Sequence, residues 1–348
     1  MSIPRTKPLR TLIVLATGLT MLLTGCAGGV SDAAGSPAAQ AATGGGGTTL
    51  SVYAFSVAKP AIESLGKSYA TTSSGSGVTL QASYGASGDQ SRKVVAGAPA
   101  DVVAFSLEPD VTRLAQANLV ASDWKSGSLN GTPFGSVVVM VVRKGNPKGI
   151  HDWSDLLKPG VDVVTPNPLS SGSAQWNLLA PYSAASNGGK DSAAGLAYVT
   201  QLVTEHVHTQ PTSGAEATES FRQGTGDVLL SYENEAIAAI KAGDAFEYVI
   251  PPQTFKIENA VAVVSTSTKK DAAASFVSFI STTAGQEAVA AAGYRPADQT
   301  VLAAHAQQYP APDKLWSIAD LGGWPAVTSS LFVMSTAATT AIYSKVTR

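Results

Sequence analysis

The sequence predicts an α/β fold. Short apolar segments with the length of strands alternate with longer segments of helical length, a pattern typical of sheets covered by helices. Beyond a Gly- and Ala-rich stretch, residues 48–348 supply 301 residues, near the size at which one hydrophobic core divides into two. Hydrophobic residues make up 44% of the chain, which excludes wholesale disorder. We therefore expect doubly wound sheets with flanking helices.

The expected elements follow one another along the chain from residue 50. Apolar segments predict strands at 50–55, 78–83, 101–105, 137–142, 161–164, 227–231, 248–251 and 260–264. Helices are expected at 59–70, 89–96, 174–185, 192–204, 216–223, 233–242 and 271–292. In such sheets, ligands bind beyond the carboxyl ends of the strands, where the chain turns into the next helix. These turns are therefore the places where we expect the chemistry.

The first 26 residues predict an exported lipoprotein. Arg5, Lys7 and Arg10 precede an apolar run at 12–23, and Leu-Thr-Gly-Cys stands at 23–26. A basic start, a short apolar run and a small-residue cleavage site form a secretory signal, and this run is too short to span a membrane. Cys26, the one cysteine of the chain, occupies the position that a bacterial lipobox needs. We expect residues 1–25 to be removed and Cys26 to be lipidated, which anchors the protein on the extracytoplasmic face of the plasma membrane.

The composition of the chain excludes some classes of binding partner and site. Residues 26–47 are rich in Ala, Gly and Ser and contain one charged residue, so we expect a flexible tether. Cleavage removes three of the 23 basic residues and none of the 25 acidic residues, so the formal net charge falls from −2 to −5. Nucleic acid is not an expected partner, since it requires a strongly basic face. A single cysteine also excludes a disulfide framework or a multi-cysteine metal site.

Four turns that lead into predicted helices resemble one another. They lie at 56–60, 84–90, 165–173 and 212–216, and each carries small residues where a helix is expected to begin. A helix N-terminus has unpaired N–H groups and roughly half a positive charge. Several such ends aimed at one point bind an anion without any lysine or arginine. Ordinary helix capping explains each turn equally well when it is taken alone.

Long stretches of the chain carry a family resemblance. They are SYGASGDQSRKVVAGAPADVVAFSL (83–107), VRKGNPKGIHDWSDLLKPGVDVVTPNPLSSGSAQWNLLA (142–180), GDVLLSYENEA (226–236), GYRPAD (293–298) and LGGW (321–324). In these segments the chain resembles the sulfate-binding proteins of ABC-type sulfate and thiosulfate importers, and the likeness extends over essentially all of 50–330. The resemblance implies a two-lobe clamshell of the periplasmic-binding-protein type (type II). One lobe would comprise 48–132 plus 246–348, and the other 133–245.

The resemblance also implies the ligand donors. In the family, sulfate is held in the cleft by backbone N–H groups, one serine hydroxyl and one tryptophan indole. Carried over by motif, the backbone donors are Ser56, Ser87, Gly172 and Ser173, the hydroxyl donor is Ser171, and the last backbone donor is Gly214 or Ala215. The closed protein would then deliver its ligand to a membrane permease driven by a cytoplasmic ATPase.

Two residues depart from the family pattern. Tyr232 stands at the indole position, where a phenol can donate a hydrogen bond but can also accept one. Asp89 stands where the family commonly has lysine. A carboxylate early in a helix interacts favourably with the helix dipole. The alternative is that Asp89 points into the cleft and accepts a hydrogen bond there.

A site made only of donors favours sulfate over phosphate. Phosphate keeps a proton that such a site leaves unpaired, at a cost of about 1–3 kcal/mol. Thiosulfate is the second candidate for the ligand, and phosphate, molybdate or tungstate remain alternatives, because the sequence does not give the size of the cleft. A secreted hydrolase is disfavoured, since the chain has no nucleophile elbow and no His-Glu-x-x-His motif. We expect a monomer that is not an enzyme and needs neither metal nor cofactor.

Some conspicuous side chains have two interpretations. Glu233 and Glu235 either support lobe closure through hydrogen bonds or simply suit the start of a helix. Trp153, Trp176 and Trp324 are expected in the core rather than against a ligand. His206 and His208 should point to different faces of a helix, which argues against a metal pair there.

Overall fold

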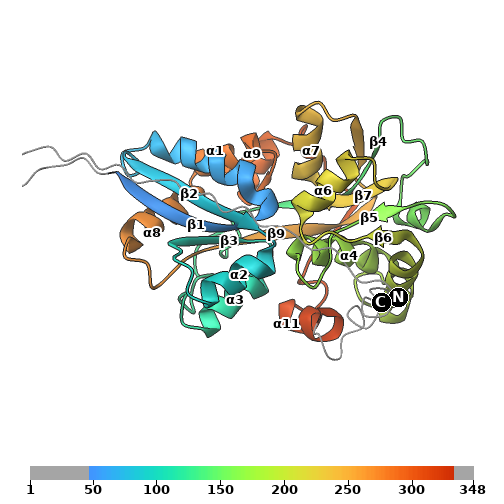
Figure 1. Cartoon of the computed structure of the whole chain (residues 1–348), viewed down its shortest axis with the longest axis horizontal. Coiled ribbons are helices and arrows are strands. Elements are labelled where there is room, and N and C mark those ends of the chain that lie inside the picture. Colours follow the sequence, from blue (N-terminus) through green and yellow to red (C-terminus); the bar gives the residue numbers. More distant parts are fainter. Residues whose placement is uncertain (1–46, 333–348) are drawn as a thin grey trace, which may run out of the picture. The chain divides into compact units, whose positions relative to one another are not determined.

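The computed structural model describes residues 47–332. The predicted signal peptide, Cys26 and all but the last residue of the predicted tether lie outside the described residues. The predicted alternation of strands and helices is confirmed (Figure 1). The strands are β1 (Thr48–Phe55), β2 (Val78–Gly85), β3 (Val102–Phe105), β4 (Phe134–Arg143), β5 (Val163–Val164), β6 (Val207–Thr209), β7 (Val228–Tyr232), β8 (Phe246–Val249), β9 (Gln253–Val263), β10 (Arg295–Pro296) and β11 (Lys314–Trp316).

The helices lie between the strands in the order expected of an α/β protein. They are α1 (Lys59–Ala70), α2 (Ser87–Val95), α3 (Glu108–Gln116), α4 (Gly172–Ala185), α5 (Ser192–Gln201), α6 (Gly214–Arg222), α7 (Glu233–Lys241), α8 (Lys270–Ile280), α9 (Thr283–Ala291), α10 (Gln299–Ala304) and α11 (Trp324–Val327). Shorter helical turns are η1 (Ser56–Ala58), η2 (Trp153–Leu157), η3 (Leu202–His206) and η4 (Thr328–Phe332). Within residues 47–332, no helix has both the length and the apolar character needed to cross a membrane.

The strands are hydrogen-bonded in the order β2-β1-β3-β9-β4-β7-β5-β6. Within the group β2-β1-β3 the pairing is parallel, as it is within β7-β5-β6. Between these groups, β9 and β4 run antiparallel to each other and to their outer neighbours β3 and β7. The two long strands therefore connect two parallel groups of the sheet.

Each of the two connecting strands changes its partner strand along its length. In β4, residues 134–137 pair with β9, and residues 138–142 pair with β7. In β9, residues 256–259 pair with β4, and residues 260–263 pair with β3. Strand β8 pairs with β4 at residues 140–143. The division into lobes at 132/133 and 245/246 stays a prediction.

The sheet is buried on both faces, which explains its continuous apolar runs. Along β4, Val138, Met140 and Val142 join the core on one face, and Val137, Val139 and Val141 join the core on the other. The second face is covered by α6 and α7, while α4 lies on the first (Figure 1). Around β3, α2 and α3 cover one face, and α1 and α9 lie on the opposite side (Figure 1). Alternate side chains of a strand point to opposite faces, so a charged side chain at 137–142 would be buried on either face.

Two expectations about elements are corrected. The helix predicted at 271–292 is two helices, because Thr282 caps a new helix by accepting a hydrogen bond from the Gly285 N–H at 3.2 Å. The strand predicted at 260–264 begins earlier, at Gln253. The predicted core positions of Trp153, Trp176 and Trp324 are confirmed, since each is less than a tenth exposed.

Candidate anion-binding site

The first and fourth turns meet. Ser56 opens η1 directly after β1, and Ala215 lies in the first turn of α6. The Ala215 N–H donates to Ser56 Oγ at 3.4 Å. A Cβ atom placed on Gly214 would lie 3.2 Å from a methyl carbon of Val57. Turns that are separated by 159 positions in the chain are therefore in direct contact.

The third turn lies against the second and the fourth. A Cβ atom added to Gly88 would lie 3.2 Å from the Ser170 carbonyl oxygen. The start of α2 therefore lies beside the turn that leads into α4. A Cβ atom on Gly214 would lie 3.1 Å from Ser173 Oγ, which brings the start of α6 to the start of α4. The four turns that the sequence singled out therefore converge. Glycine permits this close approach at Gly214 and Gly88.

Ser171 is the N-cap residue of α4 and is 3% exposed. Its backbone N–H donates to the Asn167 carbonyl at 2.9 Å, and its hydroxyl makes no cap bond to the first amides of α4. Ser213 differs, because its hydroxyl accepts from the Glu216 N–H at 3.3 Å and so caps α6 in the usual way. The capping explanation therefore accounts for the Ser213 hydroxyl but not for that of Ser171.

The Ser87 hydroxyl takes part in a buried network. It donates to Asp110 Oδ2 at 2.6 Å and accepts from the Ser106 N–H at 3.0 Å. Asp110 also accepts from Arg113 at 2.9 Å, so its carboxylate is compensated. Ser106 and Asp110 were not among the predicted site residues. Both follow the strand at 101–105, where a fifth strand-to-helix turn was available as a signal.

Tyr232 ends β7 and is fully buried. Its hydroxyl lies 2.7 Å from Ser106 Oγ. Burial raises the pKa of Tyr232, and hydrogen bonds from Ser106 and Ser173 oppose that rise only in part. The phenol is therefore neutral at physiological pH, with one proton to donate.

Asp89 is half-exposed and paired with a cation of its own helix. Its side chain is 47% exposed and forms an ion pair with Arg92 one turn along α2. This placement supports its interpretation as a favourable residue at a helix start. The alternative, a carboxylate that accepts a hydrogen bond in the cleft, stays a prediction.

The two glutamates at the start of α7 have different surroundings. Glu233 is fully buried and accepts two hydrogen bonds from Arg295 of β10, at 2.6 and 2.9 Å. Glu235 accepts from Ser231 at 2.6 Å and from Thr218 at 3.1 Å. Burial raises the pKa of Glu235 to about 7, although these bonds lower it. A carboxyl oxygen of Glu235 would lie 3.4 Å from a Cβ atom on Gly214, so an ionisable group adjoins the fourth turn.

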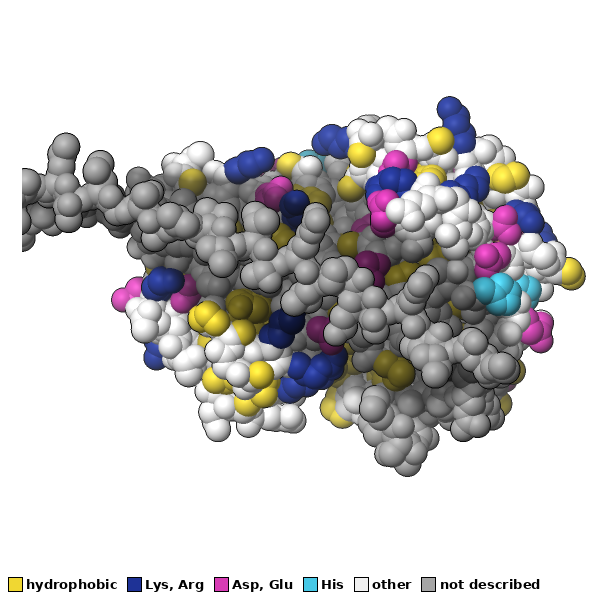
Figure 2. Space-filling model, in the orientation of Figure 1, with side chains coloured by type: hydrophobic (Ala, Val, Ile, Leu, Met, Phe, Trp, Pro, Cys, Tyr) yellow, Lys and Arg dark blue, Asp and Glu magenta, His cyan; other side chains and the backbone are white. Residues whose placement is uncertain are grey.

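The arginines near the second turn are paired with carboxylates. Arg92 is bonded to Asp89, and Arg113 is bonded to Asp110. On the face shown in Figure 2, basic and acidic side chains are scattered among many uncharged polar atoms. Within residues 47–332, no three His, Cys, Asp or Glu side chains form a group that could hold a metal ion. The first amides of α2, α4 and α6 are consequently the polar groups best placed to meet an anion.

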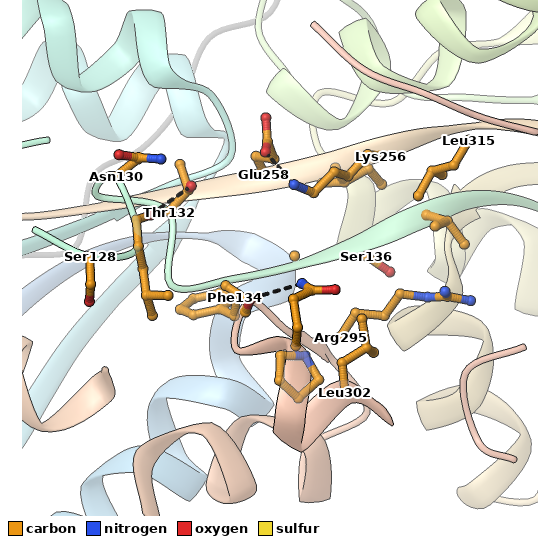
Figure 3. A pocket seen from close by; sticks show the side chains of 17 residues that line it. Ser128, Asn130, Thr132, Phe134, Ser136, Lys256, Glu258, Arg295, Leu302 and Leu315 are labelled. Carbon is orange, nitrogen blue, oxygen red and sulfur yellow. Dashed lines mark hydrogen bonds and ion pairs between the residues drawn. The ribbon is translucent and has the colours of Figure 1, made fainter. Parts of the chain in front are cut away.

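Two pockets lie near the connecting strands and the turns. One of about 240 Å³ adjoins the first and fourth turns, and Val57, Ala215 and Glu235 are among its lining residues. The other, of about 200 Å³, lies along β4, β9 and β10, with Phe134, Ser136, Lys256, Glu258 and Arg295 in its wall (Figure 3). None of the predicted site residues lines this second pocket. It is therefore separate from the converging turns.

A family model and two relatives with known names resemble this chain over most of its length. Residues 50–295 match the family model described as a bacterial extracellular solute-binding protein. A sulfate-binding protein of Synechococcus elongatus is 36% identical over 333 residues, which cover 91% of each chain. A thiosulfate-binding protein of Pseudomonas aeruginosa is 35% identical over 268 residues, which cover 74% of this chain and 80% of that protein.

Among solved structures, the sulfate-binding protein SubI from Mycobacterium tuberculosis H37Rv is similar to this chain, with a TM-score of 0.81. The two sequences are 53% identical, and the match covers 82% of this chain and all of SubI. The likeness therefore extends over most of this chain.

Proposed function

Because the chain belongs to the family of bacterial extracellular solute-binding proteins, we propose that it captures sulfate and delivers it to an ABC importer. The relatives at 35–53% identity are named for sulfate or thiosulfate, which supports this class of ligand. The observation that carries the proposal is the convergence of four turns from separate parts of the chain, with the first amides of α2, α4 and α6 among them.

The proposed donors are the N–H groups of Ser56, Ser87, Gly172, Ser173 and Gly214 or Ala215, together with the hydroxyls of Ser171 and Tyr232. Each is neutral, so the dianion would be held by dipoles and hydrogen bonds rather than by a counter-charge. The Ser171 hydroxyl supports this assignment, because it makes no cap bond to its own helix. The last donor is Gly214 or Ala215: Gly214 is buried at the start of α6, whereas the Ala215 N–H already donates to Ser56 Oγ at 3.4 Å.

Capture would proceed by closure of two lobes, 48–132 plus 246–348 and 133–245. The anion makes contacts with both lobes only in the closed form, so binding shifts the population toward closure. The contacts Ser56–Ala215 and Ser106–Tyr232 join residues of different proposed lobes and support a closed arrangement. The closed form would then dock on a permease whose cytoplasmic ATPase drives transport.

The proposal extends to the state of the mature chain in the cell. We propose that the mature chain is a monomer, held to the extracytoplasmic face of the membrane by lipid on Cys26. Its function would be binding without catalysis. Thiosulfate is the second candidate ligand, because a thiosulfate-binding protein is 35% identical to this chain.

Calorimetry on the ligand-free mature chain tests the proposal. Sulfate or thiosulfate should bind tightly, and excess phosphate should not displace it, because a donor-only site leaves the phosphate proton unpaired. Molybdate and tungstate complete the panel. Efficient competition by phosphate would contradict the assignment to sulfur oxyanions.

Ser171→Ala serves as the site variant in the same experiment. Loss of one donor to a charged group should weaken binding by about 5- to 150-fold, which corresponds to about 1–3 kcal/mol. Ser220→Ala is the matched control, since that hydroxyl only donates to the Glu216 carbonyl within α6. Equal affinities of the Ser171 variant and the wild type would remove Ser171 from the site.

A further inference from the structure

Ser106 lies between two proposed ligand donors without being one of the predicted site residues. It follows β3 directly and is fully buried. Its hydroxyl oxygen is 2.7 Å from the Tyr232 hydroxyl. The same oxygen would be 2.7 Å from a Cβ atom on Gly172, the first residue of α4. Ser106 therefore touches both the phenol and the helix start that are proposed to hold the anion.

The backbone of Ser106 is fixed on both sides. Its N–H donates to Ser87 Oγ at 3.0 Å, and its carbonyl accepts from the Trp176 indole at 2.9 Å and from Asn259 Nδ2 at 3.4 Å. The Ser87 proton is committed to Asp110, which is paired with Arg113 and so can only accept. Contacts with α2, α4 and β9 thus aim the Ser106 side chain at Tyr232.

The direction of the bond between the two hydroxyls has a chemical consequence. A phenol can either donate or accept, and its direction is set by its partners. If Tyr232 donated to Ser106, its lone pairs would face the anion and repel it. If Ser106 donates to Tyr232, the phenol proton is not used on Ser106 and can point toward the anion.

We propose that Ser106 is a positioning residue of the anion site. Its hydroxyl donates to the Tyr232 oxygen and thereby directs the Tyr232 proton toward the bound oxyanion. The inference rests on the proposed function and adds to it a residue that acts through another. Because Ser106 and Tyr232 belong to different proposed lobes, the bond forms only when those lobes are closed.

A double-mutant cycle measured by calorimetry tests the inference. Ser106→Ala should weaken binding of sulfate, or of thiosulfate if that binds more tightly, by about 3- to 10-fold, because the phenol loses its orienting donor. In the Tyr232→Phe background, the same change at Ser106 should alter affinity by less than about twofold. A merely structural role for Ser106 would weaken binding equally in both backgrounds.

Matched variants keep the result interpretable. Ser91→Ala removes another fully buried hydroxyl, which bonds Asp110 and Arg113 but not Tyr232, and should leave affinity unchanged. Ser106→Cys keeps the size of the side chain but has a weaker hydrogen-bond donor, so it should bind the anion with intermediate affinity. This variant replaces Ser106→Ala in the test if the alanine variant does not fold. Additive losses in the cycle, or full affinity in Ser106→Ala, would overturn the inference. A wild-type chain that binds neither anion contradicts the proposed function itself, and the inference falls with it.

Discussion

Hydroxyl groups make many of the hydrogen bonds around the converging turns. Ser87 donates to Asp110 and accepts from the Ser106 N–H, while the Ser106 and Tyr232 hydroxyls bond each other. Each hydroxyl can donate once and accept as well, so such a network can be fully satisfied without a net charge. This arrangement fits a chain in which only 14% of residues are charged.

The residues of the turns differ in how far sequence alone could identify them. Ser171 and Gly172 lie in a long motif that resembles a known family, and the structure brings them beside the other turns. Ser106 escapes detection because its chemistry depends on Tyr232, which lies 126 positions away. A contact of this kind arises from the pairing order of the sheet and leaves no spacing pattern in the sequence.

Glu235 predicts a pH dependence of stability. Its pKa is raised from 4.5 to about 7 in the folded chain, mainly by burial. Between these values the folded state binds more protons than the unfolded state, so the free energy of unfolding should fall as pH rises from about 4.5 to 7. Glu235→Gln should remove this contribution, and its advantage over the wild type should grow with pH. Urea unfolding at several pH values between 5 and 8 measures the difference.

The control for this experiment is Glu63→Gln. Glu63 has a side chain that is 52% exposed and lies 3.9 Å from Lys59, so its substitution should change stability little across the same range. A difference between wild type and Glu235→Gln that stays constant from pH 5 to 8 would contradict the raised pKa.

At the scale of elements, apolar runs in the sequence predict most of the strands, but they do not predict the full length of each strand. Strand β9 shows why. Its second half, 260–263, is continuously apolar, whereas the first half places Lys256 and Glu258 among apolar residues. The first half pairs with β4 at the connection between the two strand groups. A strand that passes through two environments carries two patterns, here a short alternation at 255–258 and a continuous apolar run at 260–263.

The start of α4 predicts that Gly172→Ala impairs binding rather than folding. An added Cβ atom would lie 2.7–2.8 Å from atoms of Ser106 and Leu107, so α4 would have to move away from the turn after β3. Overpacking of this size costs about 1–3 kcal/mol, so affinity for the anion should fall by about 5- to 150-fold. The melting temperature without ligand should change little, because Gly172 belongs to a different proposed lobe from Ser106 and Leu107, and the two lobes are apart in the open form.

Gly127→Ala is the matched control for Gly172→Ala. A Cβ atom on Gly127 meets no atom within 4 Å, and Gly127 has no positive φ. Its affinity should therefore equal that of the wild type in calorimetry. Undiminished affinity in Gly172→Ala would show that α4 need not approach the turn after β3 so closely.

At the scale of the whole molecule, charge and ligand have the same sign. The predicted mature chain has a formal net charge of −5, and the proposed ligand is a dianion. Long-range attraction therefore cannot come from net charge, and the binding energy has to arise locally from helix starts and hydroxyls. The sheet order makes this possible, because β4 and β9 bring turns from both strand groups to one place.

The buried ion pair between Glu233 and Arg295 joins the two proposed lobes and predicts a large effect on stability. Glu233 is fully buried, and the Arg295 side chain is 11% exposed. Arg295→Met would leave a buried carboxylate unpaired, so the free energy of unfolding in urea should fall by about 3–5 kcal/mol. Adding Glu233→Gln should recover much of this loss, because the unpaired charge disappears. Lys125→Met, which breaks a half-exposed pair with Glu108, should cost at most about 1 kcal/mol. If both single variants lost equal stability, the pair at Arg295 would contribute no more than a surface contact.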